Sequence, residues 1–152
     1  MSMSAGQGRL RDSLDSLLRV RARRGRDHRR ALGRYGEKLA VEHLLARGFS
    51  LLARNYRTRR GEIDLIAFDG RTLIFVEVKT HQLGKSQPPA SVKPLAYLSA
   101  GQLARYRPVA QAYLDDPKHT APAAQIMRFD AIGVLVDAEG AVVELQHVEG
   151  GE

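Results

Sequence analysis

Two apolar segments joined by an Asp-Gly dipeptide constrain this chain more than any other feature of its sequence. Residues 62–68 and 72–80 are rich in isoleucine, valine, leucine and phenylalanine, a composition typical of buried strands. The dipeptide at 69–70 is a preferred sequence for a two-residue hairpin turn. We therefore predict an antiparallel hairpin in which Phe68 pairs with Arg71.

One face of this hairpin carries charged side chains within otherwise apolar strands. In the predicted register, Glu62 lies directly opposite Glu77, and Asp64 is the diagonal neighbour of Glu77 at roughly 7–8 Å. Like charges that face each other destabilise a sheet unless a further group compensates them. Lys79 lies on the same face, but one lysine does not balance three acids. Because the chain has no cysteine and the donors are hard oxygens, the pattern favours Mg²⁺ or Mn²⁺.

A further carboxylate is expected on a helix before the hairpin. Residues 31–47 have helical periodicity, and Glu37 lies three, four and seven residues before Ala40, Val41 and Leu44 on the apolar side. Alternatives remain open for each acid. The hairpin charges could form a structural ion pair, Glu62 could be solvated, and Glu37 could pair with a neighbouring cation.

The remaining expected elements follow from hydrophobic periodicity and turn signals. The order helix, three strands, helix, two strands predicts an α/β domain with a mixed sheet flanked by helices. Pro108 is expected to kink the second helix. These elements are a strand at 49–56, a loop at 81–98, a helix from Ser99 to Asp116, and strands at 128–136 and 141–148.

The charge is unevenly distributed along the 152 residues. Residues 1–30 contain nine arginines and three aspartates, and we predict that they form a basic, flexible N-terminal arm. The excess of basic residues favours a polyanionic partner such as nucleic acid. No stretch is long and apolar enough to cross a membrane or to resemble a secretory signal, so a membrane partner is not expected. The absence of cysteine permits a reducing compartment, and we expect a cytoplasmic protein.

The hairpin residues also carry a family resemblance. The segment 61–67 (GEIDLIA), followed by 75–80 (FVEVKT), resembles the PD-(D/E)XK nuclease signature. More closely, it resembles the YraN-like family of small bacterial proteins, which are similar to archaeal Holliday-junction resolvases. The likeness extends from about Gly33 to the final strand and includes Arg54-Asn55 and the segment 128–130.

This resemblance implies a restriction-endonuclease-like fold over residues 31–152, with the element order αβββαββ. It implies Mg²⁺- or Mn²⁺-dependent cleavage of DNA phosphodiesters in repair or recombination, on branched or single-stranded DNA. Asp64 and Glu77 match the metal-binding carboxylates, Lys79 matches the catalytic lysine, and Glu37 matches a helix-borne acid that binds the metal. By analogy with the resolvases, a homodimer is expected.

Several polar residues are candidates for auxiliary roles. Glu62 is one, and Gln102 with Tyr106 resembles a Gln–Tyr pair on the second helix of some relatives. Alternatively, Ser99 and Gln102 form a capping box. Four arginines precede the acidic cluster and either grip phosphates or form an exposed charged turn. These arginines are Arg54, Arg57, Arg59 and Arg60. The histidines at 43, 119 and 147 lack ligand-like spacing and are interpreted as surface or boundary residues.

Three functions are compatible with these observations. The first is a metal-dependent DNA endonuclease. The second is a nucleic-acid-binding module that retains the nuclease fold without cleaving DNA. The third is an interaction protein whose acidic cluster is structural. The intact acidic pair with its lysine favours the enzyme, since a binding module has little use for these groups.

Overall fold

The computed structural model describes residues 5–95 and 100–150, and the chain divides into two compact units, residues 1–32 and 33–152. Helix α1 (Ala5–Ala46) begins in the first unit and ends in the second. The helix predicted over 31–47 therefore starts much earlier than expected. The arginine-rich segment contains no proline, and arginine is a good helix former. The flexible arm over residues 1–30 stays a prediction.

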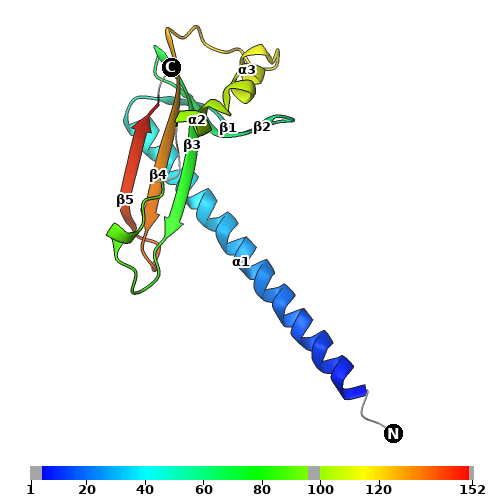
Figure 1. Cartoon of the computed structure of the whole chain (residues 1–152). Helices are drawn as coiled ribbons and strands as arrows, with labels where there is room; N and C mark the ends of the chain where they lie inside the picture. Colours follow the sequence, from blue (N-terminus) through cyan, green and yellow to red (C-terminus); the bar gives the residue numbers. More distant parts are fainter. Residues whose placement is uncertain (1–4, 96–99, 151–152) are drawn as a thin grey trace. The chain divides into compact units, whose positions relative to one another are not determined.

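The second unit contains a five-stranded mixed sheet (Figure 1) in the order β1-β2-β3-β4-β5. β3 and β4 run parallel, and the other neighbouring strands are antiparallel. The predicted α/β class, with a mixed sheet flanked by helices, is confirmed. The strands are β1 (Ser50–Thr58), β2 (Gly61–Phe68), β3 (Thr72–Gln82), β4 (Ile126–Val136) and β5 (Val142–Glu149).

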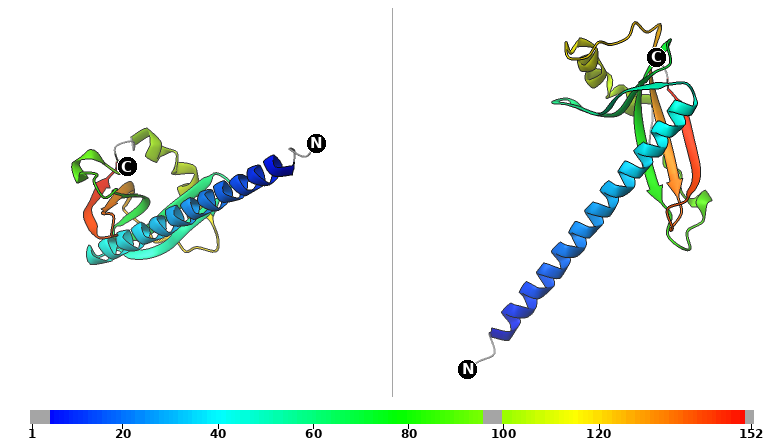
Figure 2. Two further views of the ribbon diagram at one scale, coloured as in Figure 1. Left: turned by 90° about the horizontal axis from the view of Figure 1, so that it is seen from below. Right: turned by 180° about the vertical axis from the view of Figure 1, so that it is seen from behind.

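The last turns of α1 cover one side of this sheet (Figures 1 and 2), which we call the α1 side. Ala40, Val41 and Leu44 of this helix are buried. Gly36 approaches β3 so closely that a Cβ atom there would collide with the Thr80 side chain. The missing side chain at position 36 therefore allows the helix to lie directly on the sheet.

The opposite side of the sheet is covered by α2 (Ala100–Ala104) and α3 (Arg107–Asp115). We call it the α3 side. Its core includes Ile66 and Phe75 of the hairpin together with Val109 of α3. The predicted second helix is broken in two, because Pro108 occupies the first turn of α3 instead of a helix interior.

The long segment after the hairpin also differs from the prediction. The loop expected over 81–98 starts later, since β3 continues to Gln82, and it contains a short 3₁₀ helix, η1 (Pro89–Ser91). Ser99, and with it the predicted capping box, lies outside the described residues. Over the described ranges, no helix combines the length and the apolar composition required to cross a membrane.

The hairpin register differs from the prediction by two residues. Phe68 pairs with Leu73, not with Arg71. The cause is Asp69, whose Oδ1 accepts the backbone N–H of Arg71 at 2.9 Å and that of Thr72 at 2.6 Å. These bonds hold two more residues in the turn than a two-residue hairpin turn contains. A shift of two preserves the face of every side chain, but it removes Glu62 from its predicted place opposite Glu77.

Candidate active site

Asp64 and Glu77 lie at the point where the two strands of the hairpin stop pairing. The last pair on the β2–β3 ladder is Leu65 with Val76, and one further step in this register sets Asp64 against Glu77. Asp64 Oδ2 accepts the backbone N–H of Val78 at 2.8 Å. A side chain thus replaces the next ladder bond, and this bond holds the carboxylate of Asp64 in the gap between the strands.

The environment of Asp64 disfavours its charged form. Burial is the largest cause, followed by the charge of Glu77, and together they raise the pKa of Asp64 to about 7. The Val78 N–H acts in the opposite direction, whereas a hydrogen bond with Glu77 and the charge of Glu37 raise the pKa of Asp64 further. Two carboxylates that compete in this way create a place where a cation would be stabilised.

Lys79 joins the pair through Glu77. Its Nζ lies 2.9 Å from Glu77 Oε1. The Glu77 side chain is 11% exposed, whereas that of Lys79 is 49% exposed. The ammonium group therefore lies between the partly buried carboxylates and solvent, where it would meet an incoming anion.

Tyr106 belongs to the same group of side chains, and it was not among the predicted site residues. Burial raises the pKa of Tyr106 to about 12, and the charge of Glu77 and a hydrogen bond with it act in the same direction. This tyrosine precedes α3 at its N-cap position. The sequence signal for it was its spacing from Gln102, which lies on α2. The auxiliary role of Gln102 stays a prediction.

Glu37 approaches the pair from α1. Its Oε2 accepts a hydrogen bond from Asn55 Nδ2 at 3.4 Å. Asn55 has a positive φ of 48°, an uncommon conformation that asparagine tolerates better than most residues. Glu37 raises the pKa of Asp64 through its charge. Its predicted role as a metal ligand stays a prediction.

The other predicted polar residues lie along β1 and the start of β2. Glu62 is the ladder partner of Arg57, and Arg57 Nε lies 3.3 Å from Glu62 Oε2. All four arginines predicted to grip phosphates are exposed. Their role in binding nucleic acid stays a prediction.

The donor set is compatible with a hard divalent cation, although a complete cage is not preformed. Within residues 5–95 and 100–150, no three His, Asp or Glu side chains are grouped so that they could hold a metal ion. Mg²⁺ is commonly bound by one or two carboxylates, with waters and substrate phosphates as its other ligands. Asp64 and Glu77 meet that requirement, and burial together with the charge of Glu77 raises the pKa of Asp64.

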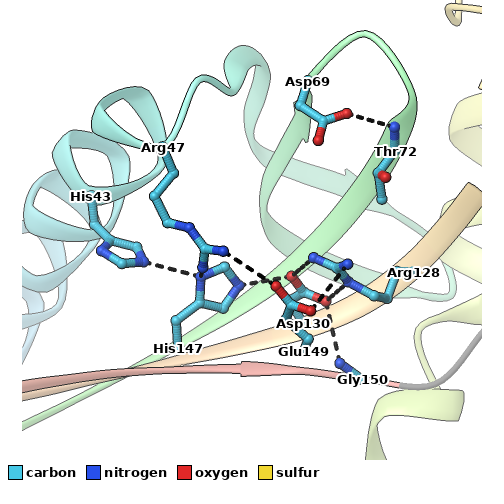
Figure 3. Close-up of polar contacts among 9 residues, drawn as sticks. All are labelled: His43, Arg47, Asp69, Thr72, Arg128, Asp130, His147, Glu149 and Gly150. Carbon is cyan, nitrogen blue, oxygen red and sulfur yellow. Dashed lines mark hydrogen bonds and ion pairs between the residues drawn. The ribbon is translucent and has the colours of Figure 1, made fainter.

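A second polar cluster, on the α1 side, was not predicted (Figure 3). Asp130 is completely buried, and Arg128 donates to it from Nε at 2.7 Å and from a terminal nitrogen at 2.9 Å. His147 Nε2 lies 2.7 Å from the same carboxylate. Burial acts to raise the pKa of Asp130, but hydrogen bonds from His147 and Arg128 outweigh burial and lower it.

This cluster includes His43 and His147, and both residues are intermediate in exposure, as expected of boundary residues. The His147 side chain is only 4% exposed, and its Nδ1 lies 3.0 Å from His43 Nε2 and 3.0 Å from a guanidinium nitrogen of Arg47. Burial, then the charges of His147 and Arg47, lower the pKa of His43. The side chain of His147 is therefore buried, and it links β5 to α1 (Figure 3). Strand alternation alone did not identify it, because its partners lie about 100 residues earlier in the chain.

Comparison with known proteins places the hairpin inside a described family region. The family model for "Uncharacterised protein family UPF0102" matches residues 36–134, which include Glu37, Asp64, Glu77, Lys79 and Tyr106. A UPF0102 protein of Chlorobium limicola is 46% identical over 109 residues, covering 71% of this chain and 78% of the relative. One of Streptomyces griseus is 41% identical over 122 residues (80% and 96%). One of Pelotomaculum thermopropionicum is 37% identical over 123 residues (81% and 96%).

Proposed function

We propose that this chain, which belongs to the uncharacterised protein family UPF0102, is a metal-dependent endonuclease that hydrolyses DNA phosphodiesters. The membership confirms the YraN-like family expected from the sequence. The observation that carries the proposal is the contact of Asp64 with Glu77, with Lys79 on Glu77, at the opening of the hairpin. This arrangement presents two acids and one cation on a single face of adjoining strands.

Asp64 and Glu77 are the residues that would hold Mg²⁺ or Mn²⁺. A divalent cation bound there would lower the pKa of a water molecule and offset the charge that develops on a phosphoryl oxygen. The Val78 N–H keeps Asp64 in place, and the Tyr106 hydroxyl does the same for Glu77. These fixed contacts reduce the reorganisation required when substrate binds.

Lys79 has the charge and the exposure to act on the substrate. Its ammonium group would donate to a non-bridging phosphate oxygen or orient the attacking water, and either action favours the transition state. Its ion pair with Glu77 keeps the ammonium near the reacting phosphate. Glu37 and the exposed arginines of β1 would extend the site toward the flanking backbone.

The test is a cleavage assay on labelled linear, single-stranded and four-way-junction DNA, with Mg²⁺, Mn²⁺ or EDTA. We expect metal-dependent cleavage by the native protein and its loss in Asp64→Asn and Lys79→Ala. Glu144→Gln and Lys85→Ala are matched controls, because both residues are exposed and lie outside the hairpin strands. Light scattering in the same buffers tests the proposed homodimer.

Two other results would replace this proposal. DNA binding without cleavage, unchanged by Asp64→Asn and Lys79→Ala, would identify a non-catalytic binding module. An ion pair between Lys79 and Glu77 that only stabilises the fold would favour this alternative. Absence of DNA binding even at low salt, where phosphate contacts are strongest, would leave an interaction protein.

A further inference from the structure

A cavity of about 570 Å³ opens directly beside the candidate active site. Its volume lies within the range of small-molecule binding sites, and its basic members are Lys79, His81 and Lys93. Among the described residues that line it, none is acidic. The lining residues are Lys79, Thr80, His81, Ala90, Ser91, Val92, Lys93 and Pro94.

The cavity lies along the face of β3 that carries Glu77 of the candidate active site. Because side chains alternate along a strand, Glu77, Lys79 and His81 extend from the same face. Along this face the charge is negative at the acidic pair and positive at Lys79 and in the cavity beyond it. An anionic chain that reached Asp64 and Glu77 would therefore find a cationic surface on its further side.

Gly133 explains how the cavity acquires its wall. It is the β4 partner of Lys79 in the parallel register. A Cβ atom at this position would lie 2.8 Å from Leu95 Cγ and 3.2 Å from Pro94 Cβ. Only the missing side chain lets residues 94–95 pack against the sheet at this point, next to the backbone of Lys79.

The rest of the wall is held by the short helix η1 and by the base of the loop. Ser91 Oγ donates to the Pro88 carbonyl oxygen at 2.6 Å. Leu83 is buried, and its N–H donates to the Val136 carbonyl oxygen at 2.8 Å. These contacts hold the chain before Lys93, and the packing of Pro94 and Leu95 against Gly133 holds it afterwards, so the lysine is presented by a structured wall.

We propose that this cavity binds a backbone phosphate of the DNA strand, adjacent to the phosphate at Asp64 and Glu77. The proposal rests on the proposed nuclease function and adds the path of the substrate along β3. Lysine binds phosphate as a compact point charge. Among the described lining residues, Lys93 and Lys79 supply positive charge and none is acidic, although Lys79 also pairs with Glu77 beside the cavity. The DNA strand is favoured as ligand because the cavity is continuous with the site that would cleave it.

The test compares Lys93→Ala with Lys85→Ala. Both lysines are exposed and lie on the same connecting segment, but only Lys93 lines the cavity. Fluorescence anisotropy with a labelled single-stranded oligonucleotide in EDTA gives Kd at several salt concentrations. We expect Lys93→Ala to raise Kd about five- to ten-fold and to reduce the slope of log Kd against log salt by about 0.7. Lys85→Ala should leave the slope unchanged.

Gly133→Ala is a second variant, because it keeps both lysines and pushes against Leu95. We expect it to raise Kd in the same direction, with an unchanged circular dichroism spectrum. Equal effects of Lys93→Ala and Lys85→Ala, or none from either, would overturn the cavity as a phosphate site. Binding of a mononucleotide that is lost in Lys93→Ala would overturn the strand as its ligand.

The cleavage assay separates this proposal from the one it rests on. Lysine-dependent binding without cleavage of any substrate would leave the cavity in place and refute the nuclease. Cleavage by the native protein with no specific effect of Lys93→Ala on the salt slope would support the nuclease and refute the cavity.

Discussion

The carboxylate of Asp64 accepts the backbone N–H of Val78 at 2.8 Å, so the same side chain closes the β2–β3 ladder and faces Glu77. Structure and proposed catalysis thus depend on the same carboxylate, for different reasons. The hydrogen bond from the Val78 N–H requires an acceptor atom, whereas metal binding requires a negative charge. Substitutions at position 64 separate the two requirements.

Asp64→Asn keeps an oxygen acceptor for Val78, whereas Asp64→Ala removes it. We expect both variants to lose cleavage, because neither supplies a carboxylate. We expect Asp64→Ala to lower the free energy of unfolding by about 1–3 kcal/mol, because it leaves a partly buried N–H without its partner. Urea denaturation measures the difference. Equal stability of the two variants would show that the Val78 bond contributes little.

The stability of the metal-free protein should decrease as pH rises from about 4 to about 7. The pKa of Asp64 is raised from its ordinary value of 3.8 to about 7. Its protonated form is therefore favoured by folding, and the unfavourable charge develops as pH rises through this window. Melting temperatures in EDTA at pH 5 and pH 8 should differ less in Asp64→Asn than in the native protein.

Mg²⁺ should restore part of the stability that the protein loses as pH rises. Because a metal ligand must be deprotonated, Mg²⁺ should raise the melting temperature more at pH 8 than at pH 5.5. Asp64→Asn should show a smaller increase at both values. An increase in melting temperature that is equal in the two proteins would place the Mg²⁺ elsewhere.

Lys79→Ala should separate catalysis from stability. The lysine is about half exposed, and ion pairs at such positions contribute roughly 0–1 kcal/mol. We therefore expect little change in the free energy of unfolding and a decrease of about 100-fold or more in cleavage rate. Denaturation and single-turnover cleavage of the same preparation provide both values. Loss of stability with unchanged cleavage would instead identify a structural ion pair.

Gly36→Ala should destabilise the contact between α1 and β3. Its Cβ would collide with Thr80, and overpacking of this kind costs about 1–3 kcal/mol. Thr80→Ala in the same chain should recover part of the loss, because it removes Oγ1 and Cγ2 but keeps Cβ, which lies 2.8 Å from the added atom. A double-mutant cycle from urea denaturation measures the coupling. Additive effects would show that the helix accommodates the methyl group by moving.

Asp130→Asn should lower stability and change the response to acid. The pKa of Asp130 lies below its ordinary value, so its contribution is present above about pH 4 and is lost as pH falls further. Removing its charge leaves Arg128 without its buried partner, at a cost of roughly 3–5 kcal/mol. Unfolding measured between pH 2.5 and pH 6 should be less dependent on pH in the variant.

Strand alternation predicted that Asp64, Glu77 and Lys79 share a face, and the contacts of Glu77 with Asp64 and Lys79 agree with that grouping. Alternation was wrong for Ile63, which belongs to the same buried cluster as Ile66 although the two are three residues apart. A register error of two residues leaves the face of each side chain unchanged, so the grouping of Asp64, Glu77 and Lys79 did not depend on the turn. The turn itself was not predictable from the Asp-Gly dipeptide. It depends on the Asp69 side chain, which accepts two backbone N–H hydrogen bonds that backbone oxygens would accept in a shorter turn.

Contacts between distant elements account for what the sequence did not reveal. Tyr106 reaches Glu77 because the helix breaks before Pro108, and periodicity does not specify where the second piece packs. The burial of His147 depends on partners from α1 and β4. Spacing within one segment carries no information about such partners.

The contacts of Arg47 join the end of α1 to a strand that is synthesised much later. Its contacts to His147 and Glu149 span 100 and 102 residues. A growing chain on the ribosome therefore has α1 and the whole hairpin available long before the end of that helix can be secured. The hydrogen bonds that tie the end of α1 to β5 can therefore form only after the last strand has been synthesised, whereas the packing of α1 on β3 can precede them.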